Sequence, residues 1–189
     1  MGATVAGLRA VPVAVDERFR IDVSSISPAD AERALCLWVN TPGNPAGGLD
    51  DLSAVAHWGR SHGVPIFSDE CYVEFTWDAP AGTILQSGLD GVVAVHSLSK
   101  RSNLAGVRVG FYAGDAELVN YLKEVRKHAG LMVPGPAQAA GAVALADDDA
   151  LLVGATEECL RWVTPIQAFC RTTTTAVELG GREIPEGAY

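Results

Sequence analysis

Short apolar runs alternate with helix-like stretches along most of this chain. The runs that predict strands lie at residues 34–39, 64–67, 91–95 and 107–113. The first of them is continuously apolar, which is typical of a strand buried on both faces. The stretches that predict helices lie at 49–62, 115–128 and 135–146. This alternation predicts an α/β fold, with an open, mostly parallel sheet flanked by helices.

Local signals mark the ends of the predicted helices. Asp50 and Asp51 favour the start of the first helix, since acidic side chains stabilise a helix N-terminus. Gly63 is expected to end that helix, because glycine readily adopts the left-handed conformation found at helix ends. Pro136 suits an early position in the last predicted helix.

Polar segments rich in Gly and Pro follow three of the predicted strands. They are residues 40–47, 69–72 and 97–100. In open α/β sheets, ligands bind at the carboxyl ends of the strands. The chemistry of this protein is therefore expected in these three segments.

Composition narrows the possible partners. The formal net charge is -9 and the pI is near 4.8, which argues against nucleic acid or an anionic membrane as the main partner, because both attract clustered Lys and Arg. No apolar run approaches the roughly 20 residues that a membrane span needs. The four cysteines form no C-x-x-C pair, and a reduced, cytoplasmic setting without a bound metal is expected.

Lys100, Asp69, Tyr72 and Asn44 offer chemistry at the strand ends. A lysine that sheds its proton can act as a nucleophile toward an aldehyde, and a carboxylate can hold a proton on a heterocyclic nitrogen. A phenol and an amide can bind a ring oxygen. Taken singly, each residue has a plainer interpretation: a solvated charge for Lys100, a loop-stabilising carboxylate for Asp69, a core-edge phenol for Tyr72 and a turn amide for Asn44.

Ser97, Ser99 and Arg108 offer groups suited to a phosphate. The two serines supply hydroxyls, and the guanidinium of Arg108 can bind a phosphate through two hydrogen bonds. A free surface arginine is the plainer interpretation of Arg108. The apolar neighbours in VRVGF count against it, because an unpaired charge among them would be costly.

These segments resemble the fold-type I, pyridoxal-phosphate (PLP)-dependent aminotransferases of class I/II. The matching motifs are N-P-A-G at 44–47, S-D-E-C-Y at 68–72, S-L-S-K at 97–100 and the arginine that follows. The family commonly has Thr where this chain has Ala46.

The resemblance implies a role for each candidate residue. Lys100 would bond to the cofactor and carry the proton, Asp69 would bind the pyridine nitrogen, and Asn44 and Tyr72 would bind the ring oxygen. The phosphate would be bound by Ser97 and Arg108, with Ser99 as a further candidate. The implied partners are amino-acid and 2-oxo-acid substrates, and the family forms homodimers.

The resemblance covers only part of the chain. Residues 1–148 are expected to form a partial PLP-binding large domain, and 149–189 a tail of uncertain structure that does not resemble the family. The Gly/Ser-rich phosphate turn that family members carry upstream is not recognisable, so the chain is expected to be a fragment.

Three functions stay open at this point. Within the family, the matching segments look most like actinobacterial succinyldiaminopimelate aminotransferases of lysine biosynthesis, which favours amino transfer. The second is another PLP reaction on the same fold, by a lyase or a decarboxylase. The third is a non-catalytic fragment with weak or no PLP binding.

Overall fold

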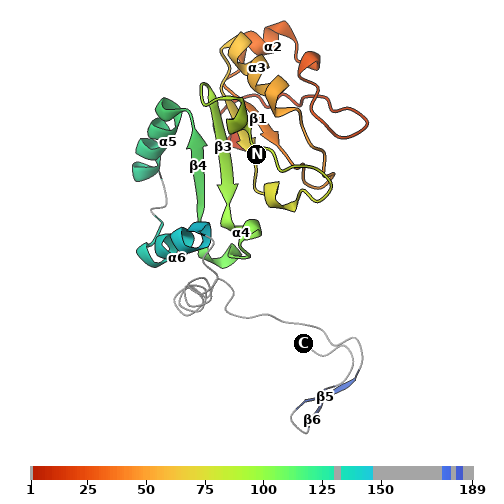
Figure 1. Ribbon diagram of the computed structural model, residues 1–189, viewed down its shortest axis with the longest axis vertical. Coiled ribbons are helices and arrows are strands. Elements are labelled where there is room, and N and C mark those ends of the chain that lie inside the picture. The colour runs from red at the N-terminus through yellow and green to blue at the C-terminus, as the bar shows by residue number, and fades with distance from the viewer. Residues whose placement is uncertain (1, 130–132, 147–175, 180–181, 185–189) are drawn as a thin grey trace.

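The computed structural model describes residues 2–129, 133–146, 176–179 and 182–184, and its body is a four-stranded sheet flanked by helices (Figure 1). The strands are β1 (Leu37–Asn40), β2 (Ile66–Asp69), β3 (Val92–Ser97) and β4 (Gly110–Gly114), in the spatial order β1-β2-β3-β4. The first three are parallel, and β4 runs antiparallel to β3. The mostly parallel α/β sheet expected from the sequence is confirmed.

Helices and single 3-10 turns connect the strands. Figure 1 shows α2 and α3 near β1, α5 beside β4, and α6 near α4 at the end of the sheet where β4 begins. The α-helices are α1 (Gly2–Val5), α2 (Pro28–Arg33), α3 (Leu52–His62), α4 (Leu98–Arg101), α5 (Ala116–His128) and α6 (Gly135–Ala146). The 3-10 helices are η1 (Val23–Ser25), η2 (Val73–Phe75), η3 (Ile84–Ser87) and η4 (Ala105–Val107).

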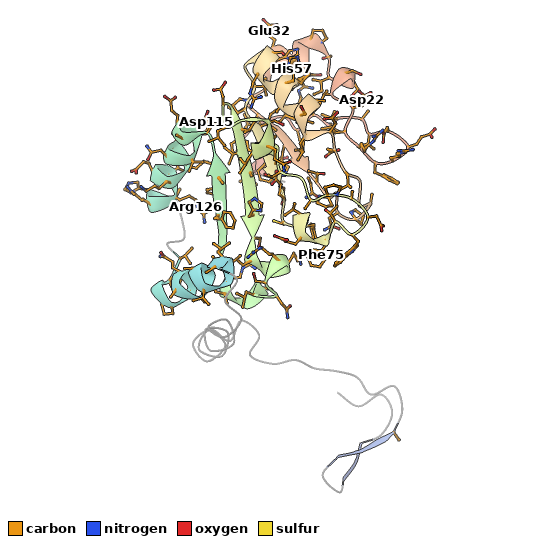
Figure 2. All side chains as sticks on the ribbon, viewed as in Figure 1. Asp22, Glu32, His57, Phe75, Asp115 and Arg126 are labelled. Atoms are coloured by element: carbon orange, nitrogen blue, oxygen red, sulfur yellow. The ribbon has the colours of Figure 1, made fainter. Side chains whose placement is uncertain are left out.

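Capping side chains determine where the two longer surface helices begin. The Asp51 carboxylate accepts a hydrogen bond from the Ala54 N–H at the start of α3, at 3.0 Å. Gly63 ends α3 with a φ of 65°, as the sequence predicted. Asp115 caps α5 in the same way, and Figure 2 shows it at the end of the sheet away from α4. These caps place each helix start one to three residues later than its apolar pattern suggested.

Two apolar clusters hold the body together. The larger one lies between α3, η3 and one face of the sheet, where Ile66, Ile84 and Val92 are fully buried. The smaller one joins α4, η4 and α6 around Leu98 and Ala140. The smaller cluster therefore supports the helix that carries Lys100.

The first predicted strand was wrong in two respects. It was expected over 34–39 with both faces buried, but β1 begins only at Leu37, and Trp38 is 54% exposed. Trp38 stacks on Phe67 on the face of the sheet opposite α3. A continuous apolar run indicates that a segment is apolar on both sides, but it does not indicate whether another element covers each side.

The last predicted strand starts later than expected. The apolar run at 107–113 predicted a strand from its first residue, whereas β4 begins at Gly110. Residues Ala105–Val107 form a 3-10 helix, and Arg108 follows it with a φ of 57°. The left-handed backbone at Arg108 is incompatible with an extended strand, so the chain turns there before it pairs with β3.

The expected tail at 149–189 lies mostly outside the described residues. Within it the structure describes a two-stranded antiparallel pair, β5 (Val177–Leu179) with β6 (Arg182–Ile184). The boundary proposed at residue 148 stays a prediction.

Candidate functional site

The carboxyl ends of β1, β2 and β3 meet at one end of the sheet because these strands are parallel. The backbone carbonyl of Asp69 accepts hydrogen bonds from the Thr41 N–H and from the side-chain amide of Asn40, both at 3.1 Å. These bonds hold the loop after β1 against the end of β2. Asn40 was not among the residues singled out in the sequence, although its position as the first polar residue after an apolar run was a usable signal.

The loops after β1 and β2 meet through Asn44 and Tyr72. The side-chain oxygen of Asn40 accepts a hydrogen bond from the Asn44 N–H at 2.9 Å, which orients the turn. The Asn44 amide then donates to the Tyr72 hydroxyl at 3.2 Å, across 28 positions of sequence. Two residues expected to bind the same ring oxygen are therefore brought together.

Lys100 lies on α4, which begins at the end of β3. Ser97 caps this helix by accepting a hydrogen bond from the Ser99 N–H at 3.2 Å. Leu98 is fully buried, whereas Lys100 points outward, and its ammonium nitrogen lies 5.9 Å from the centre of the Tyr72 ring. The Lys100 side chain is therefore exposed, with the Tyr72 ring as its neighbour.

Arg108 and Ser99 form the second contact among the candidate residues. The guanidinium of Arg108 donates to the Ser99 hydroxyl at 3.2 Å and to the Ala105 carbonyl at 2.9 Å. Arg108 is exposed where the chain turns, and its guanidinium keeps these two partners. The result is a cation beside a hydroxyl at the start of α4.

Asp69 is half-buried at the end of β2, and one of its carboxylate oxygens accepts the Cys71 N–H at 3.2 Å. Burial, and then the carboxylate of Asp69, raise the pKa of the Cys71 thiol to about 12, while the charge of Lys100 acts in the opposite direction. Both charges therefore shift the pKa of the Cys71 thiol. Asp69 and Lys100 therefore lie near the same thiol, although no hydrogen bond among the described residues joins the two side chains.

Sequence reasoning also missed a buried carboxylate beside Asp69. Glu70 is 1% exposed and accepts a hydrogen bond from the Ile84 N–H at 2.8 Å. Its second oxygen lies 3.5 Å from the imidazole of His96, the residue before Ser97. A glutamate directly after a strand usually faces solvent, so its position in the sequence carried no signal for burial.

The site contains the groups that a phosphorylated aromatic aldehyde requires. It has an amine in Lys100, a carboxylate in Asp69, a phenol and an amide in contact, and a guanidinium beside a hydroxyl. Across the described residues there is no group of three metal-ligating side chains. No helix within that same part of the chain is long and apolar enough to cross a membrane.

Comparison with known proteins identifies the family. The family model described as aminotransferase class I and II matches residues 1–159. A probable aminotransferase of Mycobacterium tuberculosis is 43% identical over 156 residues, which are 78% of this chain and 35% of that protein. The 4-dedimethylamino-4-oxo-anhydrotetracycline transaminase OxyQ of Streptomyces rimosus is 41% identical over 78% of this chain and 41% of its own length.

Solved structures agree with the sequence comparison. A probable N-succinyldiaminopimelate aminotransferase from Thermus thermophilus superposes with a TM-score of 0.73 at 28% identity, over 82% of this chain and 43% of that one. The chain belongs to the class I and II aminotransferases. These enzymes use PLP, act on amino and 2-oxo acids and are typically dimeric. The chain spans less than half the length of these relatives.

Proposed function

We propose that this chain provides the lysine-bearing part of an aminotransferase large domain that binds PLP at the carboxyl ends of β1, β2 and β3. The convergence of three contacts carries the proposal: Asn44 contacts Tyr72, Arg108 contacts Ser99, and the Lys100 ammonium lies over the Tyr72 ring. Side chains from segments far apart in the sequence therefore lie close together, and their polar groups would suit a phosphorylated pyridine aldehyde.

Each side chain has a task that follows from its chemistry. When bound, PLP supplies an electron sink that stabilises negative charge at the α-carbon of an amino acid. Lys100 would hold the cofactor through its aldehyde carbon, with water as the leaving group, and would be the group that carries a proton to and from the substrate. Asp69 would hold the proton on the pyridine nitrogen, and the Asn44 amide and Tyr72 phenol would donate to the ring oxygen.

The phosphate would be bound by Arg108 with Ser97 and Ser99. Arg108 supplies a permanent positive charge, and Ser97 and Ser99 supply hydroxyls at the start of α4. Since α4 has four residues, the helix itself provides little dipole, and the side chains must provide most of the attraction.

The proposed substrates are amino acids of the diaminopimelate type, with N-succinyldiaminopimelate as the first candidate. The support is the Thermus thermophilus neighbour of that name and the LL-diaminopimelate aminotransferase of Aquifex aeolicus, which is 34% identical over 141 residues. The substrate side chain would be selected by residues beyond the site described above. The substrate and the activity of the whole protein therefore rest on relatives rather than on this chain.

The test is covalent capture of the cofactor. The chain is incubated with PLP, reduced with borohydride, digested and examined by mass spectrometry, and a pyridoxyl adduct is expected on Lys100. Lys100→Arg keeps the charge but removes the nucleophile, because a guanidinium stays protonated, so it should abolish the adduct. Lys123→Arg on α5 is the matched control and should leave the yield unchanged. A stoichiometric adduct on another lysine would refute the proposal.

A second measurement separates amino transfer from the other functions. Protein that carries PLP is mixed with N-succinyl-LL-diaminopimelate or LL-diaminopimelate, and conversion of PLP to its amine form is followed by absorbance. Conversion would support amino transfer, and carbon dioxide or a cleaved side chain would indicate a decarboxylase or a lyase. Failure to capture PLP at any concentration tested would leave the non-catalytic fragment as the surviving interpretation.

A further inference from the structure

We propose that Glu70 is a positioning residue whose buried carboxylate holds closed the loop that carries Tyr72. The loop runs from Cys71 to Thr83, between β2 and η3. The inference rests on the proposed function only for its consequence at the cofactor, because the closure itself is a property of the chain.

Glu70 binds both ends of this loop. Its backbone carbonyl accepts the Val73 N–H at 3.1 Å, where η2 begins. Its side-chain carboxylate accepts the Ile84 N–H at 2.8 Å, where η3 begins 14 positions later. Its own N–H donates to the Val95 carbonyl of β3 at 2.9 Å. One residue thus joins the start of the loop, the end of the loop and the neighbouring strand.

Burial makes this closure strong. The Glu70 side chain has no exposed surface, so the carboxylate has given up its hydration and depends on protein partners. One oxygen receives the Ile84 N–H, and the other lies 3.5 Å from the His96 imidazole, with no hydrogen bond of its own among the described residues. His96 stacks on Phe111 with ring centres 4.8 Å apart, which fixes the imidazole against β4.

The loop position matters because of what the loop carries. The Tyr72 hydroxyl receives the Asn44 amide, and its ring lies 5.9 Å from the Lys100 ammonium. The same loop is also tied to α4 from its exposed side by the ion pair of Glu74 with Arg101 at 3.1 Å. Exposed pairs contribute little, so the buried bond of Glu70 is expected to be the one that determines where Tyr72 sits.

Three variants of the full chain test this assignment. Glu70→Asp keeps the charge but shortens the side chain by one methylene, so the bond to Ile84 is expected to break. Glu70→Gln keeps the length and the acceptor oxygen but makes a neutral bond, roughly half as strong. Glu74→Gln changes a neighbouring carboxylate that does not bind Ile84, and it is the matched control. Circular dichroism establishes that each variant is folded.

Hydrogen exchange of the Ile84 amide reports the closure directly. Relative to wild type, exchange is expected to accelerate on the order of tenfold to a hundredfold in Glu70→Asp and about threefold to tenfold in Glu70→Gln, and to be unchanged in Glu74→Gln. Unaccelerated exchange in folded Glu70→Asp would overturn the proposal. If that variant does not fold, Glu70→Gln decides alone, and wild-type exchange of Ile84 in it would overturn the proposal equally.

Two further signals separate positioning of Tyr72 from a general structural role. With 3-fluorotyrosine incorporated, the fluorine resonance of Tyr72, assigned through Tyr72→Phe, should move in Glu70→Asp and return toward wild type in Glu70→Gln. The same resonance unmoved in both would show that Glu70 does not position the phenol. If wild type captures PLP, Glu70→Asp should raise the PLP concentration for half-maximal capture by roughly tenfold. If wild type captures none, the proposed function fails and the exchange and fluorine signals still decide the role of Glu70.

Discussion

The cavity of this molecule and its cluster of candidate polar side chains lie in two different regions. A cavity of about 760 Å³ lies along β1, lined by the N-terminal segment and by apolar side chains such as Val11, Phe19 and Trp38. None of the seven candidate residues lines it. The strand-end site is open instead, with Lys100 and Arg108 exposed.

The cavity is explained by the position of β1 at the edge of the sheet. Within the described residues β1 pairs on one side only, so the cavity marks a place where an edge strand and a loop fail to pack closely. Large apolar cavities are the usual first choice for a ligand site. The proposed cofactor site instead rests on polar groups that converge from separate strands, because binding and proton transfer depend on such groups and not on volume.

The largest expected effect is on packing beneath the strand-end site. Leu98→Ala removes a fully buried side chain that anchors α4, and we expect it to lower the free energy of unfolding by about 2–5 kcal/mol. Leu35→Ala is the matched change on the cavity wall, where the side chain is 67% exposed. It should cost no more than about 0.5 kcal/mol. Urea unfolding measures both, and equal losses would mean that α4 is not anchored as described.

A smaller effect is expected where the two regions meet. A Cβ atom on Gly48, at the end of the loop that carries Asn44, would lie 2.3 Å from the backbone oxygen of Phe19 on the cavity wall. Gly48→Ala must therefore push the two segments apart, and we expect a loss of about 1–3 kcal/mol in unfolding free energy.

Gly43→Ala provides the control for that change. Its nearest atom, the Asn40 carbonyl oxygen, would be 3.4 Å away, which an added methyl group tolerates. The control should stay within about 1 kcal/mol of wild type. A stable Gly48→Ala would show that the loop and the cavity wall move independently.

The smallest effect compares one cysteine from each region. Cys36 lines the cavity and is exposed, whereas Cys71 lies beside Asp69. Partial loss of hydration raises the pKa of the Cys36 thiol, whereas burial and then the Asp69 carboxylate raise the pKa of the Cys71 thiol to about 12. Because only the thiolate reacts, iodoacetamide at pH 8 should alkylate Cys36 at least roughly tenfold faster than Cys71.

The two thiols should also differ in how their alkylation rates depend on pH. Alkylation of Cys71 should keep rising with pH well above 9, as its thiolate forms only near pH 12. Peptide mass spectrometry distinguishes the two sites, and in concentrated urea the two rates should become similar, since the environment of each thiol is then lost. A Cys71 that reacts as fast as Cys36 in the folded chain would contradict the raised pKa.

Much of the architecture could be predicted from local sequence. The order of the four strands and the three longest helices, the end of α3 at Gly63 and the full extent of α6 follow from apolar period and capping residues, which act within a few positions of one another. The strand-end segments that hold the candidate residues could be predicted for the same reason. In a parallel sheet, whatever follows the strands gathers at one end.

The sequence by itself determined which candidate site residues are present and in what order they follow one another along the chain. The motifs around Asn44, Asp69 and Lys100 were sufficient to indicate the aminotransferase family, which the comparisons confirmed. The roles of the single residues stay predictions, because roles depend on contacts that no motif contains.

Only the tertiary structure decided which side chains meet and which are covered. The contact of Asn44 with Tyr72, the exposure of Trp38 and the burial of Glu70 depend on which strands pair, in what register, and on what packs against each face. The physical reason is that propensity and capping act over a few residues, whereas burial and hydrogen bonding join positions 28 apart in one case and 14 apart in another. A glutamate that reads as a surface residue became the buried centre of a loop because of contacts that lie beyond the reach of local patterns.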